Sequence, residues 1–260
     1  MNKLNRQKGF TITELLITVT LGMSVISSIL LGYLATYTSS MNTLANSRLS
    51  QEMNALMSVM VGELRRSGYT GDTDTATSPT DNLFNVANLT ALEVFDNMTS
   101  NTQVAATGSG SCIVYSYDLD EDGVVDANEV LGWRLNSNKV QVRISGDTTD
   151  PDTCATASNT WVDVTDPNFI TITALTFDLS SSACLNTREP DGVDNDSANG
   201  IDDADEYDCY SQVPAASSGD ITVETREIGI TLTGNLTSDS FVRMSLSKSV
   251  RVRNDWVRIW

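Results

Sequence analysis

A run of twenty residues without a charged side chain, residues 15–34, constrains this chain more than any other feature. At about 1.5 Å per residue, an α-helix of that length crosses the roughly 30 Å of hydrocarbon in a bilayer. Residues 1–9, ahead of the run, contain three basic residues and no acidic residue. Because positively charged flanks stay in the cytoplasm, this asymmetry predicts one membrane span with everything after it exported.

The composition excludes many kinds of chemistry. The 260 residues include no histidine, and 16 basic against 34 acidic residues give a net charge of −18. Without imidazole, Ser-His-Asp and Cys-His catalysis and His-ligated zinc or haem drop out. Strong negative charge repels phosphate backbones, so no nucleic-acid partner is expected. The carboxylates stand in metal-like spacings rather than isolated in apolar surroundings, and we predict no catalytic residues and no enzyme.

A further signal lies between the basic leader and the apolar run. Gly9 precedes Phe10, and Glu14 stands at the fifth place after the glycine. An ordinary secretory signal has a shorter apolar stretch, closed by a small-residue cleavage site that is not found here. A plain membrane anchor is the alternative. A plain anchor gives no reason for the acidic Glu14 at the start of the apolar helix. Placing a carboxylate in the membrane costs about 2–3 kcal/mol, and less near the interface.

These residues resemble the class III signal of type IV prepilins and pseudopilins. The resemblance implies that prepilin peptidase cuts between Gly9 and Phe10, methylates the amino terminus of Phe10, and leaves the apolar helix on the mature subunit. It implies that Glu14 neutralises the Phe10 ammonium of a neighbouring subunit, as a carboxylate in lipid requires. The implied location is the inner membrane, with one span and a periplasmic head, and then the pilus at the cell surface.

The apolar pattern predicts that the helix continues beyond the membrane. Apolar residues recur at spacings of three, four, five or seven, without proline between Ala35 and Arg66, and Gly68 is the predicted terminator. We predict a leader at 1–9, a membrane and assembly helix at 10–34, and its packed continuation at 35–69. The stripe comprises Met41, Leu44, Leu49, Met53, Leu56, Met57, Met60 and Leu64.

Residues 70–260 are predicted to form a β-rich head. Runs of β-branched residues predict strands at 112–117, 130–135, 139–144, 169–179, 221–233 and 241–252. Gly234 and Asn235 predict a hairpin turn between the last two. The predicted fold class is α+β and pilin-like, with a long N-terminal α-helix packed against an antiparallel β-sheet.

Residues 118–129 have the spacing of an EF-hand calcium loop, with acids at places 1, 3, 5, 9 and 12 and a glycine at place 6. The predicted ligands are Asp118, Asp120, Asp122, the backbone carbonyl of Val124, Asp126 and Glu129. Six acids in a tight loop repel one another unless a cation binds, so a merely solvated turn explains the pattern less well. The residues on both sides of the loop are predicted to be strands and not helices. The calcium-driven opening of a helix pair, as in calmodulin, is therefore not expected.

Residues 189–208 form a second and weaker calcium candidate. They fit the same template only with one residue inserted before Asn199, and Asp202 then falls where an apolar residue is expected. The predicted ligands are Asp194, Asp196, Asn199, the backbone carbonyl of Ile201, Asp203 and Glu206.

Four cysteines, Cys112, Cys154, Cys184 and Cys209, follow the predicted span and enter an oxidising compartment, where disulfides persist. A bridge from Cys184 to Cys209 would close about 26 residues around the second acidic stretch, which stabilises by roughly 3–4 kcal/mol. It would leave Cys112 with Cys154, but four cysteines permit three pairings and the spacing does not choose. Their wide, irregular spacing and exported location disfavour zinc.

Three further features resemble the PilW-type minor pilins: the length, the basic-tinged strand at 249–254, and the residues around the first acidic loop, 115–118 and 132–135. The resemblance implies a minor pilin that contributes to pilus assembly or initiation at the tip. Its implied partners are other minor and major pilins, prepilin peptidase and the inner-membrane assembly platform. The J-type pseudopilins of type II secretion share the anchor and size, so a pseudopilin is one alternative. A calcium-dependent adhesive tip module is another.

Overall fold

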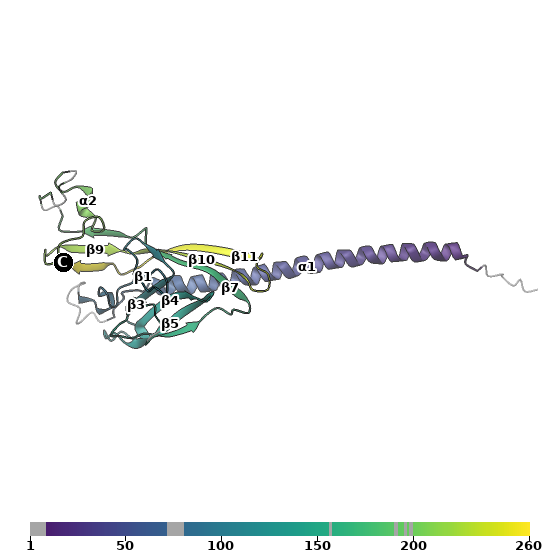
Figure 1. Ribbon diagram of the computed structural model, residues 1–260, viewed down its shortest axis with the longest axis horizontal. Coiled ribbons are helices and arrows are strands. Elements are labelled where there is room, and N and C mark those ends of the chain that lie inside the picture. Colours follow the sequence, from purple (N-terminus) through teal and green to yellow (C-terminus); the bar gives the residue numbers. More distant parts are fainter. Residues whose placement is uncertain (1–8, 72–80, 156–157, 190–191, 195–196, 198–199) are drawn as a thin grey trace, which may run out of the picture. The chain divides into compact units, whose positions relative to one another are not determined.

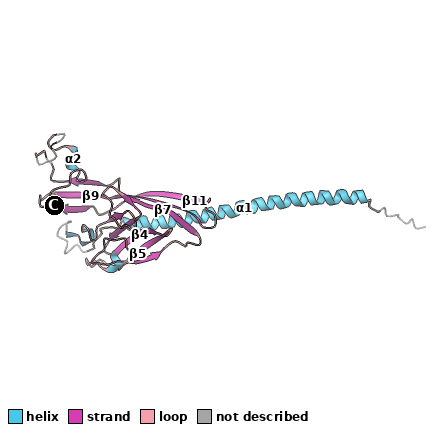
Figure 2. Cartoon of the chain, viewed as in Figure 1, coloured by secondary structure: helices cyan, strands magenta, loops and turns pink. Residues whose placement is uncertain are grey.

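A computed structural model describes residues 9–71, 81–155, 158–189, 192–194, 197 and 200–260 (Figure 1). Internal contacts divide the chain into two compact units, Met1–Arg48 and Leu49–Trp260. One long helix supplies most of the helical residues, and the second unit is built mainly of strands (Figure 2). This arrangement is the predicted α+β, pilin-like fold.

Helix α1 (Ile12–Leu64) contains a stretch long and apolar enough to cross a membrane, with a mean hydropathy of 2.1 and no residue of it buried. Serine and threonine hydroxyl groups within this stretch donate to backbone carbonyls of the helix itself. Thr20 donates to the Leu16 carbonyl, Ser24 to the Leu21 carbonyl and Ser28 to the Ser24 carbonyl. Because lipid offers no hydrogen-bond partner, such bonds allow polar residues inside an apolar helix.

The second half of α1 carries the core stripe of the second unit. Its buried side chains are Leu49, Met53, Met57, Met60 and Leu64. Their spacings of three and four place them on one face of the helix, as the sequence predicts. Met41 and Leu44, which the prediction included, are exposed side chains of the first unit. Burial within the chain therefore begins at Leu49.

Helix α1 ends at Leu64, four residues before the predicted terminator Gly68, and a turn leads from Leu64 to that glycine. Its φ of +72° is one that residues with a side chain rarely adopt. The Gly68 N–H donates to the Ser116 carbonyl at 2.8 Å, and the Asn82 side chain donates to the Gly68 carbonyl at 2.7 Å. The turn after α1 is thus tied directly to the sheet.

In the described part of the chain, the strands form three antiparallel sheets. The five-stranded sheet contains, in spatial order, β1 (Glu93–Phe95), β3 (Cys112–Ser116), β4 (Val130–Asn136), β5 (Lys139–Ser145) and β6 (Thr160–Asp163). The four-stranded sheet contains β11 (Arg243–Arg251), β10 (Glu227–Leu236), β7 (Ile170–Asp178) and β2 (Ser109–Gly110). The three-stranded sheet contains β12 (Trp256–Ile259), β9 (Ile221–Thr225) and β8 (Ala183–Asn186). Short helices occur at Leu83–Asn85, Ala127–Glu129 and α2 (Ala204–Tyr207).

The predicted turn at Gly234 and Asn235 is wrong. Both residues lie inside β10, opposite Met244 and Arg243 of β11, and the chain turns only after Leu236. Gly234 stands at a register shift against β7, and a Cβ there would lie 3.1 Å from the Ile172 side chain. The glycine therefore permits a close approach between strands, not a turn.

The other long strands fall where predicted, with one exception. The predicted strand at 221–233 is two strands, β9 and β10, interrupted at Arg226 and belonging to different sheets. The prediction missed β1, β2, β6, β8 and β12, each of which has only two to four residues. Such short strands carry too little alternation to be recognised.

Replacing Met57 with alanine is expected to lower the free energy of unfolding by about 2–5 kcal/mol, because the Met57 side chain is 0% exposed and its loss leaves a cavity. Val59, one half-turn away and 53% exposed, provides the matched control, and Val59→Ala should change stability by less than about 0.5 kcal/mol. Thermal unfolding of the full chain in detergent measures both. Equal effects of the two variants would contradict the assigned core face.

Candidate functional site

The predicted cleavage site lies just ahead of α1. Gly9 and Phe10 precede the first helical residue, Ile12, and the Phe10 side chain is 83% exposed. A Cβ built on Gly9 would meet no atom within 4 Å. The peptide bond between Gly9 and Phe10 is therefore not enclosed by the described part of the chain.

Glu14 makes a local contact that the sequence analysis did not anticipate. Its Oε2 accepts hydrogen bonds from the Thr11 N–H and the Thr11 hydroxyl, both at 3.0 Å. The Glu14 N–H in turn donates to the Thr11 hydroxyl at 3.3 Å. This reciprocal pair is a capping box, and the Thr-x-x-Glu spacing was its signal in the sequence. Thr11 and Glu14 thus cap the helix, which begins at Ile12, two residues after Phe10.

The first acidic loop, 118–129, connects β3 to β4 and gathers its acids into two groups that share Asp120. Ligand atoms of Asp118, Asp120 and Glu129 lie within 4.8 Å of one another, and so do those of Asp120, Asp122 and Asp126. Each of the five carboxylates named from the spacing thus belongs to at least one of the two groups, and only Asp120 belongs to both. Gly123, at place 6, has a φ of +73°, as the sharp turn of such a loop requires.

The two end residues of this loop are its most buried. Asp118 is 2% exposed and Glu129 is 0% exposed. Glu129 accepts hydrogen bonds from the Leu119 N–H at 2.6 Å and the Asp126 N–H at 2.9 Å, one on each oxygen. These bonds close the loop by joining its last residue to its start.

Asp118 anchors the loop to the turn after α1. Its Oδ2 accepts from the N–H groups of Gly71 and Gly123, at 2.9 Å and 3.1 Å. Its Oδ1 is buried and has no hydrogen-bond partner in the described structure. A buried carboxylate oxygen without a partner costs free energy, and a bound cation removes that cost. The donor set, five carboxylates at places 1, 3, 5, 9 and 12 of the loop, suits the all-oxygen coordination of calcium.

The second acidic stretch brings together a different set from the predicted one. Ligand atoms of Glu189, Asp202 and Glu206 lie within 4.8 Å of one another. Only Glu206 belongs to the predicted ligands, whereas Asp202 had been placed where an apolar residue was expected. Asp196 and Asn199 lie outside the described residues.

The remaining predicted ligands of that stretch are not in the group. The Asp203 side chain accepts hydrogen bonds from the N–H groups of Asp205 and Glu206 and thereby caps α2. The Ile201 side chain is exposed, and Asp194 is described without belonging to the cluster. The Asp-x-x-Glu spacing at 203–206 is a capping-box signal that could have indicated this role.

The cysteines form two disulfides, Cys112 with Cys154 and Cys184 with Cys209. This is the pairing that the sequence allows when Cys184 and Cys209 bridge the second acidic stretch and leave Cys112 to Cys154. Cys112 and Cys154 are buried against Phe95 and Val114, with Trp161 packed on the cluster. Two buried arginines hold the segment that carries Cys154: Arg134 donates to the Cys154 carbonyl, and Arg143 donates to the Pro151 and Thr153 carbonyls.

A buried carboxyl group outside both acidic loops was also missed. Glu93 on β1 is 4% exposed, and burial together with the neighbouring Asp152 raises the pKa of Glu93 from 4.5 to about 8. An isolated glutamate in a sequence gives no sign of such burial. At neutral pH this side chain is mostly protonated and carries no charge.

Glu93 is expected to make stability fall as pH rises. Because its folded-state pKa lies above the unfolded value, folding favours the protonated form. That contribution is complete below about pH 4.5 and is lost as pH rises through about 8. The fall in melting temperature between pH 5 and pH 9 should shrink in Glu93→Gln and persist in Glu52→Gln, whose side chain is exposed. An identical pH profile for Glu93→Gln and the unchanged protein would refute this role.

Four features together define a type IV prepilin-like protein. They are a basic leader, a Gly-Phe junction, a glutamate near that junction, and a long apolar helix ahead of antiparallel sheets. The family model for prepilin peptidase-dependent protein B matches residues 42–252, and the prokaryotic N-terminal methylation motif matches residues 4–32. The chain belongs to the prepilin peptidase-dependent protein B family. Pilin-like families are structural, so the chain is not an enzyme. No curated protein and no solved structure matches it significantly.

Proposed function

We propose that this chain is a minor pilin of a type IV pilus that contributes to pilus assembly or initiation at the tip. The observation that carries the proposal is the processing motif joined to an apolar helix with exposed side chains. Large exposed apolar surfaces bind lipid or other protein chains. The first half of α1 therefore anchors the subunit in the inner membrane and packs against other pilin subunits in the fibre.

The proposed processing uses the residues at the start of α1. Prepilin peptidase cuts between Gly9 and Phe10 and methylates the amino group of Phe10. Glu14, whose carboxylate must find a cation in an apolar setting, neutralises the Phe10 ammonium of a neighbouring subunit. The capping bonds from Thr11 hold this carboxylate at the helix start, on the side nearest Phe10.

The proposed location of the head is the periplasm and then the cell surface. Two disulfides support export to an oxidising compartment. The proposed partners are prepilin peptidase, the inner-membrane assembly platform, and other minor and major pilins. The PilW-type assignment is part of this proposal.

Calcium is proposed as the cofactor of the head. Asp118, Asp120, Asp122, Asp126, Glu129 and the Val124 carbonyl would hold it. The buried, unpartnered oxygen of Asp118 and the grouping of the carboxylates support this site. Calcium there would remove the mutual repulsion of the acids and fix the connection between β3 and β4. For the second stretch, the cluster of Glu189, Asp202 and Glu206 makes a weaker case, because three acidic residues near one another are common without an ion.

Deleting the gene is the experiment that separates the proposed function from its two alternatives. A minor pilin predicts a loss of surface pili, with type II secretion unchanged. A pseudopilin predicts the reverse, and an adhesive tip module predicts normal pilus number with reduced surface attachment. Pili counted by electron microscopy and secreted enzyme activity measure these outcomes, and a copy carrying Val59→Ala on exposed helix surface serves as a complementation control.

A further inference from the structure

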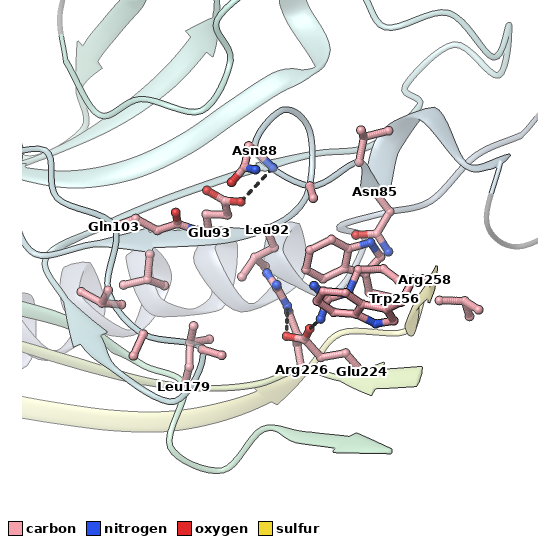
Figure 3. Close-up of a pocket in the computed structure, with 18 of the residues that line it drawn as sticks. Asn85, Asn88, Leu92, Glu93, Gln103, Leu179, Glu224, Arg226, Trp256 and Arg258 are labelled. Carbon is pink, nitrogen blue, oxygen red and sulfur yellow. Dashed lines mark hydrogen bonds and ion pairs between the residues drawn. The ribbon is translucent and has the colours of Figure 1, made fainter. Parts of the chain in front are cut away.

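A cavity of about 730 Å³ lies within the second unit, between β1 and β12 (Figure 3). One wall contains Leu92, Glu93 and Val94, and residues 103–106 extend it. The facing wall contains the residues of β12 and the final Trp260, together with Glu224 and Arg226. We propose that this cavity binds an extended, acidic polypeptide segment of another protein chain, which adds as a strand to β12.

The lining shows that β12 presents its edge to the cavity. Five consecutive residues, 256–260, line it. Successive side chains of a strand point to opposite faces, so a cavity beside one face would be lined by every second residue only. A cavity lined by all five lies alongside the strand's edge.

That edge is open in the described structure. β12 pairs with β9 and has no strand on its other side among the described residues. The Trp260 N–H donates to the Asp220 carbonyl, in line with the register that pairs Arg258 with Thr222. Because hydrogen-bonded positions alternate in an antiparallel pair, the peptide groups of Val257 and Ile259 face away from β9. These groups are the donors and acceptors that an added strand needs.

The opposite wall does not compete for that strand. The Val104 N–H already donates to the Val94 carbonyl at 2.9 Å, and Phe95 forms a bridge with Gln103. This side of β1 is therefore covered by the chain itself. It offers the apolar side chains of Leu92, Val94 and Val104, against which a bound segment can bury its own apolar residues.

The charge of the lining selects an acidic segment. Arg226 and Arg258 both bind the buried Glu224, at 2.8 Å and 3.1 Å. They also stack on Trp256, at 4.7 Å and 4.1 Å from the ring centre. Two guanidinium groups share one carboxylate, and the neutral Glu93 adds no negative charge at pH 7. Among the side chains that line the cavity, the two guanidinium groups thus outnumber the ionised carboxylate of Glu224 by one, in a chain whose net charge is −18, and this favours a partner's carboxylate.

A small carboxylate ligand is the competing occupant, since cavities of this size commonly hold one. The open edge of β12 favours a peptide, because a row of free peptide groups recognises another backbone and has no function toward a compact small molecule.

Peptide binding to the full chain in detergent tests the proposal. The probe is a fluorescent peptide of about six residues, alternating threonine and valine, with one central glutamate. Fluorescence anisotropy should show saturable binding of this probe. The same peptide with lysine in place of glutamate should bind at least about tenfold more weakly, and so should a version with alternate backbone nitrogens methylated.

A matched pair of variants locates the site. Val257→Pro removes the outward N–H without removing a bond to β9, since proline is tolerated on an open strand edge. It should weaken binding at least about tenfold, whereas Val257→Thr, which keeps the N–H, should stay within about threefold. Equal binding of the glutamate, lysine and N-methylated peptides would overturn the proposal. Binding of free glutamate as tightly as the peptide would overturn it too, by assigning the cavity to a small carboxylate.

Discussion

Gly9→Leu is expected to leave residues 1–9 on the protein and to stop its incorporation into fibres. The structure separates this effect from a folding defect, because a Cβ on Gly9 meets nothing within 4 Å and Gly9 precedes the helix. A side chain at Gly9 therefore disturbs no contact of the described chain. It disturbs only the fit of the cleavage junction in prepilin peptidase.

Gly22→Ala is the matched control for this prediction. Gly22 lies inside α1, and a Cβ there also meets nothing within 4 Å. The control should be processed as the unchanged protein is, because it lies outside the junction. The intact mass of each protein from cells that contain the peptidase measures processing. Maturation of Gly9→Leu to a form beginning at Phe10 would show that the junction is not recognised as proposed.

Calcium is expected to raise the melting temperature of the chain by about 5–10 °C when its concentration is 100 times the dissociation constant. That excess stabilises the folded state by about 2.7 kcal/mol. In a folded unit of about this size, each kcal/mol shifts the melting temperature by about 2–4 °C. The rise should disappear with a calcium chelator and should be much smaller with magnesium, which requires tighter octahedral geometry.

Asp118→Asn and Glu129→Gln should each abolish most of this rise, because both are buried end residues of the first acidic loop. Glu121→Gln is the matched control, since Glu121 lies in the same loop at a place the template does not use for a ligand. It removes one negative charge and should keep the calcium response. A melting curve of the full chain that neither calcium nor chelator changes would refute the calcium proposal. If Glu121→Gln lost the calcium response as fully as Asp118→Asn does, the response would be a general effect of charge and not of the predicted ligands.

The features that sequence reasoning recovered are local ones. The helix with a membrane-length apolar run and the grouping of the acids in the first loop each depend on neighbours in the chain, and a side-chain pattern displays them directly. The Gly-Phe junction is equally local, and its cleavage stays a prediction. The stripe from Leu49 to Leu64 was recovered for the same reason, because helical periodicity fixes which side chains share a face.

The features it missed depend on residues that are distant in the chain. Gly234 was read as a turn because the close approach of Ile172 cannot be seen from its neighbours. The second acidic stretch was matched to a template, whereas its described part contains the capped helix α2 and is followed by Cys209, which is bonded to Cys184. The cavity between β1 and β12 exists only because segments far apart in the sequence meet.

The N-terminus of the unchanged protein, isolated from membranes that contain prepilin peptidase, tests the central claim most directly. Peptide mass spectrometry should find a first peptide that begins at Phe10 and carries one methyl group on its amino nitrogen. A first peptide that still contains Gly9, or one that begins after the apolar run, would contradict the assignment of this chain as a processed subunit of a pilin-type fibre.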